Sequence, residues 1–252
     1  MWKIVCVHYY DNEKNKNKFL KEKIIPFFNY LSKMYSIEEY YYDRDWKFGP
    51  HFEIHINISQ QYNFDEIFNL IKKELKSYMN SNHQEIEIDK SHYIEVANQL
   101  SKLEEVEEGF LPIKSDGEIW VKPYLKTGNK GKHISNDTKL LFEKFRIVSR
   151  SLVEETLYYL SKKCSKDQDL FWCRVFFLAA QVYPKEGIKR GYLSFKSHVE
   201  GFFGNTDKRA LKYKEKFIIY EKKIEKDVDN VLISTVENFK EYSEEEKLLE
   251  KW

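Results

Sequence analysis

The segment WKFGPHFEIHINIS, residues 46–59, decides how the first part of this chain folds. It begins as a turn around Gly49 and Pro50 and continues as a run in which apolar and polar residues alternate. The apolar residues are Phe52, Ile54, Ile56 and Ile58, and the polar ones are His51, Glu53, His55 and Asn57. Since successive side chains of a strand point to opposite faces, the segment predicts a strand with one apolar and one polar face.

The polar row of this strand has three interpretations. It is a solvated outer face that needs no function, a metal site, or the lining of a cleft for a polar substrate. Imidazoles and a carboxylate two residues apart could converge on zinc. However, the other histidines are scattered and complete no cluster, so we expect no metal; they are His8, His83, His92, His133 and His198.

Composition restricts the function further. The 252 residues include 42 Lys and Arg against 41 Asp and Glu, so overall charge gives no reason to expect nucleic acid or a membrane surface as partner. Three cysteines without a CxxC motif suit a reducing compartment. With no signal-peptide layout and no apolar run of membrane length, we expect a cytoplasmic protein. We find no glycine-rich phosphate loop and expect no cofactor.

The first 82 residues predict a ferredoxin-like α+β part. Strands and helices are expected in the order β-α-β-β-α, with Pro26 kinking or dividing the first helix. The apolar face of strand 51–59 should then pack under the helices, while its polar row faces away and is either solvated or covered by later chain. The expected elements are strand 2–10, helix 17–35, strands 37–46 and 51–59, and helix 64–79.

The rest of the chain predicts two further regions of one 252-residue domain. Residues 83–133 are irregular, and residues 134–252 are rich in long helices, the first of which starts at an Asn or Asp cap. The acidic tail 244–250 reads as a solvated helix end. The expected elements are strand 85–89, helix 91–108, strand 117–125, a loop at 126–133, and helices 136–163, 167–183 (starting at Asp167 or Asp169 and stopping before Pro184), 191–204 and 206–239.

Three segments resemble one family in order and spacing. YYYDRDWKFGPHFEIHI, residues 40–56, resembles the aromatic-Arg-Tyr/Trp-x-x-Gly-Pro-His-x-x-x-Arg motif of the lantibiotic-dehydratase C-terminal family, also called the thiopeptide-type bacteriocin biosynthesis domain. LLFEKFRIVSRSLVEETL resembles a helix of that family with Ser149 at its serine. SFKSHVEGFF resembles its late S-x-x-x-HM-x-x-NR segment with His198 at the histidine. The resemblance extends from Trp2 to about Phe217.

The chain also departs from this family where the family binds substrate. Its glutamate-elimination enzymes hold a glutamyl carboxylate with arginines, because arginine binds carboxylates through paired hydrogen bonds. Where their strand reads H-x-R-x-R, this chain has Glu53 and His55, and Gly201 and Phe202 replace the late NR. The resemblance therefore favours another branch, the stand-alone thiopeptide pyridine synthases, which join two dehydroalanines of a modified precursor peptide by a formal aza-[4+2] cycloaddition.

This resemblance implies a cofactor-independent enzyme that works by positioning and proton transfer. We expect Glu53 to be an acceptor or base and His51 or His55 a donor, while His198 transfers protons on a helix face shared with Ser194 and Ser197. The expected catalytic residues are His198, Glu53, Ser197 and Glu200. The expected substrate-binding residues are His51, His55, Asp43, Asp45, Ser194 and Gln181.

The expected partner is the modified precursor peptide, with its leader bound by residues 83–124 through an exposed strand edge. The resemblance leaves a homodimer open. Two alternatives stay open as well: a glutamate-elimination subunit of lanthipeptide or thiopeptide biosynthesis, and a non-catalytic leader-peptide-binding module of the same family.

Overall fold

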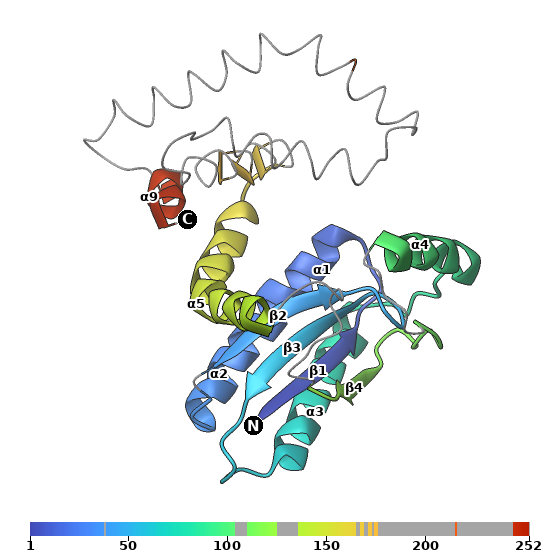
Figure 1. The fold of residues 1–252 in the computed structure, drawn as a ribbon, viewed down its shortest axis with the longest axis horizontal. Helices are drawn as coiled ribbons and strands as arrows, with labels where there is room; N and C mark the ends of the chain where they lie inside the picture. Colours follow the sequence, from blue (N-terminus) through green and yellow to red (C-terminus); the bar gives the residue numbers. More distant parts are fainter. Residues whose placement is uncertain are drawn as a thin grey trace. The chain divides into compact units, whose positions relative to one another are not determined.

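A four-stranded antiparallel sheet organises the first half of the chain in this computed structural model (Figure 1). The strands lie in the order β2-β3-β1-β4, so β3 and β1 are central and β2 and β4 form the edges. Their bounds are β1 Trp2–His8, β2 Tyr40–Asp45, β3 His51–Asn57 and β4 Ile119–Lys122. The first and third predicted strands lie in one sheet, as the ferredoxin-like prediction requires, and they pair with one another.

The structure describes part of the chain, and it divides into two compact units, Met1–Leu157 and Tyr158–Trp252. The described residues are 1–37, 39–103, 110–124, 136–164, 167–168, 171–172, 174–175, 215 and 244–251. In the described residues, no helix has both the length and the apolar character to cross a membrane.

The sheet has the connectivity of a ferredoxin-like fold. The predicted order β-α-β-β-α is confirmed, and β4 adds the last strand of a β-α-β-β-α-β unit by pairing antiparallel to β1. This strand comes from the middle region of the sequence, outside residues 1–82, so the sheet is completed by chain that follows the second long helix. The α+β prediction is therefore confirmed.

Helices cover the apolar face of the sheet. They are α1 (Glu13–Phe19), a π-helical turn η1 (Leu20–Ile24), α2 (Ile25–Met34) and α3 (Phe64–Asn82). Pro26 lies in the first turn of α2, directly after the π-helical turn. Its missing N–H is tolerated there, because the first N–H groups of an α-helix have no acceptor within that helix. Proline thus divides the predicted helix 17–35 rather than ending it.

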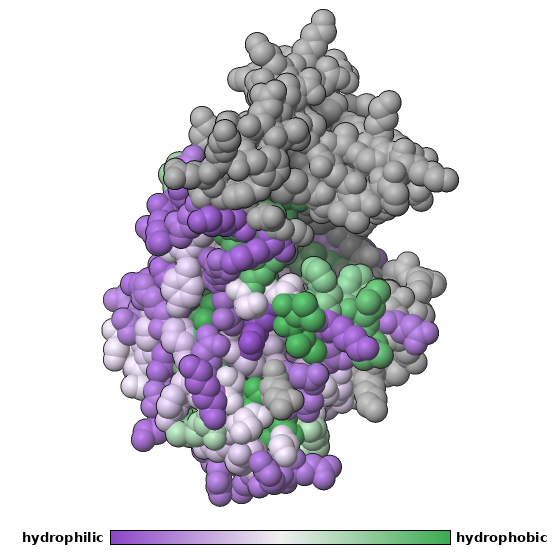
Figure 2. Space-filling model, turned by 90° about the vertical axis from the view of Figure 1, so that its left-hand side faces the viewer, coloured by the Kyte–Doolittle hydropathy of each residue, from purple (hydrophilic) through white to green (hydrophobic). Residues whose placement is uncertain are grey.

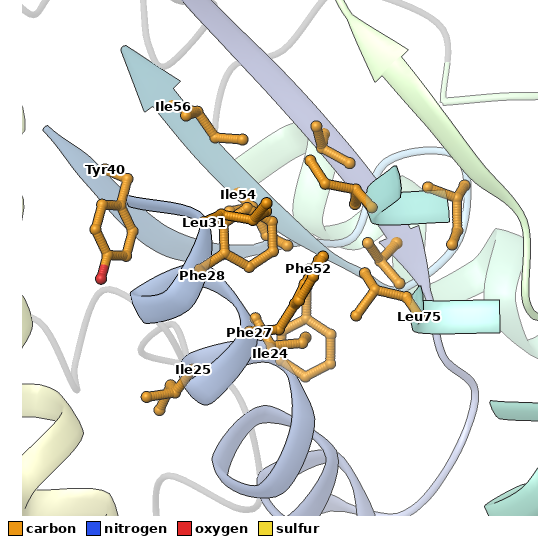
Figure 3. Close-up of a cluster of buried hydrophobic side chains, with 14 of the residues drawn as sticks. Ile24, Ile25, Phe27, Phe28, Leu31, Tyr40, Phe52, Ile54, Ile56 and Leu75 are labelled. Atoms are coloured by element: carbon orange, nitrogen blue, oxygen red, sulfur yellow. The ribbon is translucent and has the colours of Figure 1, made fainter. Parts of the chain in front are cut away.

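The core lies between these helices and the sheet (Figure 3). Phe52, Ile54 and Ile56 of β3 are at most 2% exposed and pack with side chains of α2 and α3. Each fully buried apolar side chain stabilises the fold by roughly 1.5–3 kcal/mol. The apolar half of the alternating row therefore packs under the helices, as expected.

The middle region contains one wrong prediction. Residues 85–89 form no strand. The backbone of this segment bonds to a side chain instead of a neighbouring strand: the Asp116 carboxylate accepts hydrogen bonds from the Ile86 N–H at 2.9 Å and from His83 Nε2 at 2.6 Å. The predicted helix is present as α4 (Lys90–Leu103). Its Tyr93 hydroxyl donates to the Trp46 carbonyl and accepts from the Gly49 N–H, which fastens the turn before β3.

The predicted helix 136–163 is present as α5 (Asn136–Leu160). Within the first unit, Arg146 lies 3.0 Å from the Asp43 carboxylate and the Arg150 guanidinium lies 3.7 Å from the centre of the Tyr40 ring. The opposite side of α5 carries Leu141, Phe145 and Val148, with exposed fractions of 68%, 59% and 80%. Figure 2 shows one side of the molecule, where apolar patches interrupt a largely hydrophilic surface.

The second unit is described only in part. Tyr159 packs against Phe171 with 5.7 Å between ring centres, and the described residues of the predicted helix 167–183 are helical. The tail forms α9 (Glu244–Lys251). Leu248 and Leu249 of this helix are buried, so the helix is confirmed but its expected full solvation is wrong. The predicted helices 191–204 and 206–239 and the loop at 126–133 lie outside the described residues, Glu215 excepted.

Candidate active site

The polar row of β3 faces away from the helices, and the neighbouring strands add to it. In antiparallel pairing, residues directly opposite one another share a face of the sheet. His51 lies opposite His8 and Asp45, Glu53 lies opposite Cys6 and Asp43, and His55 lies opposite Ile4 and Tyr41. Trp120 and Lys122 of β4 join the same side. We call this side the polar face; it comprises Cys6, His8, Tyr41, Asp43, Asp45, His51, Glu53, His55, Trp120 and Lys122.

The centre of the polar face is buried. His51, Glu53 and His55 retain only 5%, 4% and 7% of their surface. Burying charged or polar groups is unfavourable unless they are paired, so this strand is not the solvated outer face that alternation alone would explain. Of the two expectations, solvated or covered by later chain, solvation is therefore wrong for these three residues.

Three nitrogen-bearing side chains lie around the Glu53 carboxylate. Lys122 Nζ lies 2.7 Å from Glu53 Oε1, His55 Nε2 lies 3.2 Å from Oε2, and His51 Nε2 lies 3.5 Å from Oε1. Burial alone would raise the pKa of Glu53, but the two histidines and Lys122 outweigh burial and hold the pKa far below its usual range. An ionised carboxylate held in this way is a strong acceptor and a weak base.

Lys122 links the two central carboxylates. In addition to Glu53, its ammonium lies 3.4 Å from Asp45 Oδ2. Burial lowers the pKa of Lys122, yet the attraction of Glu53 and Asp45 is larger and the net shift is upward. The lysine is therefore a fixed cation on the polar face. The other oxygen of Asp45 accepts from the backbone N–H groups of Trp46 and Lys47, which orients this carboxylate.

The turn before β3 positions His51. Phe48 and Gly49 have φ of 62° and 101°, and a Cβ on Gly49 would come within 2.1 Å of the Tyr10 hydroxyl oxygen, so only glycine fits there. The Gly49 carbonyl lies 2.9 Å from His51 Nδ1. Because a carbonyl can only accept, His51 Nδ1 carries hydrogen in this contact.

His8 is a neutral neighbour of His51. The two rings are 4.7 Å apart, and the Trp120 indole N–H donates to His8 Nε2 at 3.0 Å. Burial, followed by the charges of His51 and Lys114, lowers the pKa of His8 from 6.5 to about 3. His8 therefore acts as an acceptor at neutral pH, and this residue was only one of the scattered histidines in the sequence.

Aromatic rings surround His55. Its ring stacks on Tyr41 with 4.2 Å between centres and 12° between planes. Trp2 contacts Tyr41 and stacks on Tyr124, whose hydroxyl donates to Glu143 of α5 at 2.6 Å. The stacked rings of Tyr41 and His55 are both buried, so they fix the His55 ring in place.

The structure brings together only part of the predicted site. Asp43, Asp45, His51, Glu53 and His55 all lie on the polar face, although Asp43 is paired with Arg146. Arg44 points to the other face and forms an ion pair with Glu13, so it is a structural residue. The other predicted residues lie outside the described part of the chain; they are Gln181, Ser194, Ser197, His198 and Glu200.

Sequence reasoning missed the cations and the thiol of the polar face. Lys122 and Trp120 belong to a strand whose pairing partner and register the sequence did not predict. The alternation of Trp120, Val121 and Lys122 was the only sequence feature indicating that Trp120 and Lys122 share a face. Cys6 Sγ, a His51 ring nitrogen and a Glu53 carboxylate oxygen lie within 4.8 Å of one another, so these three residues could hold a metal ion.

Comparison with known proteins gives the fold class and two solved structures of similar fold. No protein-family model and no curated protein matches the sequence. The chain is similar to the pyridine synthase TbtD from thiomuracin biosynthesis, with a TM-score of 0.75 and 16% identity over 99% of this chain and 78% of TbtD. It is also similar to TsrL, with a TM-score of 0.60 and 14% identity over 100% of this chain and 65% of TsrL. The chain therefore shares the fold of these two proteins.

Proposed function

We propose that the chain is a thiopeptide pyridine synthase. It would act on a precursor peptide that carries thiazoles and two dehydroalanines, and close a macrocycle by a formal aza-[4+2] cycloaddition. Two C–C bonds form, and water and the leader peptide, as its C-terminal amide, leave to give the pyridine, so no oxidant is needed. The observation that carries this proposal is the likeness in fold to a pyridine synthase along 99% of the chain.

The chemistry requires positioning and proton transfer. Holding two dehydroalanines in contact can contribute roughly 7–11 kcal/mol to lowering the barrier. One amide must tautomerise to a 2-azadiene, which needs a donor at its carbonyl oxygen and a base at its N–H. In our proposal the polar face supplies the donors: Lys122 and His55 are held by Glu53, whose carboxylate orients them instead of accepting a proton itself.

The base and acid belong to the C-terminal half in this proposal. His198 transfers protons, with Ser197 and Glu200 as relay partners and Ser194 and Gln181 as substrate contacts. Asp43, Asp45 and His51 complete the substrate side on the polar face. This assignment rests on the resemblance of SFKSHVEGFF to the family's late histidine segment, and positioned acid–base groups typically contribute about 10²–10⁴-fold.

One observation favours the second candidate, a glutamate-elimination subunit. The family's arginines are missing from β3, but Lys122 and Arg146 place two cations on the polar face from other elements. Both are already paired with Glu53 and Asp43, so they offer a glutamyl carboxylate little net positive charge. This pairing is why we prefer the pyridine synthase.

The test incubates the purified protein with a linear peptide that bears the leader, thiazoles and two dehydroalanines. We expect a pyridine-centred macrocycle and a leader amide by mass spectrometry. His198→Ala should slow turnover by about 10²–10⁴-fold. Lys76→Ala, a change at an exposed position of α3 outside the proposed leader-binding residues, serves as the control and should leave the rate unchanged. Free glutamate released from a glutamylated peptide would establish the eliminase, and leader binding without conversion would establish the binding module.

A further inference from the structure

We propose that Cys6, His51 and Glu53 form a binding site for a divalent metal ion of the zinc and cobalt class. The three residues offer a thiol, an imidazole and a carboxylate, which are the ligand types that zinc accepts. All three are buried, and their ligand atoms lie within 4.8 Å of one another. Three protein ligands leave one position of a tetrahedral site for water or a substrate group.

His51 is oriented as a metal ligand would be. Its Nδ1 lies 2.9 Å from the Gly49 carbonyl, so this nitrogen carries hydrogen and Nε2 presents a lone pair when the ring is neutral. The side chain is fully buried, and Nε2 has no hydrogen-bond partner within the part of the chain that the structure describes. A backbone carbonyl on the far nitrogen is the usual support of a metal-binding histidine.

The charges of the cluster also favour the binding of a cation. Two carboxylates, the buried Glu53 and the partly buried Asp45, share one ammonium, Lys122. When the imidazoles and the thiol are neutral, one negative charge in this described cluster has no counterpart, which is unfavourable in a buried place. A divalent ion that replaces the proton of Cys6 balances the thiolate and Glu53, and it leaves Lys122 to Asp45. The thiol proton is released to solvent.

Lys122 is the competitor of the metal ion. Its ammonium contacts the same Glu53 oxygen, Oε1, that lies closest to His51 Nε2, while His55 holds the other oxygen. Lys122 is only partly buried, on an edge strand, and Asp45 is a second partner at 3.4 Å. The metal ion therefore binds as Lys122 turns from Glu53 to Asp45, and removing the ammonium should strengthen metal binding.

The experiment titrates the full chain, stripped of metal by a chelator, with Co²⁺ and records its absorption. We expect one equivalent of Co²⁺ to produce a thiolate-to-cobalt charge-transfer band. Lys122→Met should tighten binding by about tenfold or more, because the competing cation is gone. Cys6→Ser should abolish the charge-transfer band, and His51→Gln should weaken binding by about tenfold or more. The double variant Cys164→Ser/Cys173→Ser controls for the other two cysteines and should keep the band.

Three results would overturn the proposal. The first is no cobalt band in either the natural protein or Lys122→Met, which means that the missing positive charge is a proton on a histidine of the cluster. The second is a band that persists in Cys6→Ser, and the third is a band lost in the Cys164→Ser/Cys173→Ser control. If a buried substitution at Cys6 or His51 prevents folding, the cobalt titration of Lys122→Met still tests the proposal. The readout is metal binding, so the result does not depend on the proposed peptide chemistry.

Discussion

Glu53 is held by interactions that no single strand provides. Its partners come from β3 itself and from β4, and Lys122 is 69 residues away in sequence. The carboxylate and the ammonium are each other's closest charged partners, so removing one weakens the compensation of a buried or partly buried charge. This dependence is measurable as a coupling between the two residues.

We expect Glu53→Gln and Lys122→Met each to lower the free energy of unfolding by about 2 kcal/mol, because each removes the closest charged partner of the other. The double variant should lose less than the sum, with a coupling of about 0.5–3 kcal/mol. Urea unfolding in the presence of a chelator measures this. Additive losses would show that the two groups do not interact in the folded protein.

His8 gives the protein a specific sensitivity to acid. The unfolded chain binds a proton on His8 below pH 6.5, whereas the folded protein keeps this ring neutral down to about pH 3. Stability must therefore fall as pH falls from 6.5 toward 3, by about 1.4 kcal/mol for each pH unit. Between about pH 7.5 and 5.5, unfolding in chelator should show a loss of about 1.4 kcal/mol that is absent in His8→Gln. An equal loss in that variant would assign the effect to other groups.

The sequence predicted the residues of the polar face better than their surroundings. Alternation in 51–58 placed His51, Glu53 and His55 on one face of a strand, because that inference needs only the period of a strand. Their burial could not be predicted, since it depends on which chain segment covers the face. The partners Cys6 and Lys122 depend on the register of strands far apart in sequence, and local pattern does not determine that register.

At the scale of elements, α5 is attached in an unusual way. A surface helix normally turns apolar residues inward and charged residues outward. In α5, Arg146 and Arg150 face the ferredoxin-like part and contact Asp43 and Tyr40, while Val148 is 80% exposed. The sequence predicted this helix from its Asn or Asp cap, but it could not indicate which side packs, because charged residues form the inner side here.

We expect Arg150→Met to destabilise the first unit by about 1–3 kcal/mol, because it removes the contact with the Tyr40 ring and leaves the half-buried Glu154 carboxylate without its ion pair. Val148→Ser, on the outer side of the same helix, is the matched control and should change stability by less than about 0.5 kcal/mol. Thermal unfolding compares the two. A larger effect at Val148 would mean that the outer side of α5 is the packed one in solution.

At the scale of the whole molecule, the sheet has an edge available for a peptide. β4 is the last strand on its side of the sheet as described, and only β1 pairs with it. An extended peptide can add to such an edge through main-chain hydrogen bonds. The expectation that residues 83–124 bind the leader therefore becomes a more specific proposal, in which the leader pairs with β4 as a fifth strand.

We expect a fluorescent leader peptide to bind the protein in a polarisation assay, and a core peptide without leader to bind about tenfold or more weakly. Main-chain pairing also predicts a period of two. N-methylation of individual leader amides should weaken binding at alternate positions, because only every second N–H of an added strand points toward β4. Side-chain recognition alone would give no such alternation, and equal affinity for the leaderless core would show that β4 does not bind the leader.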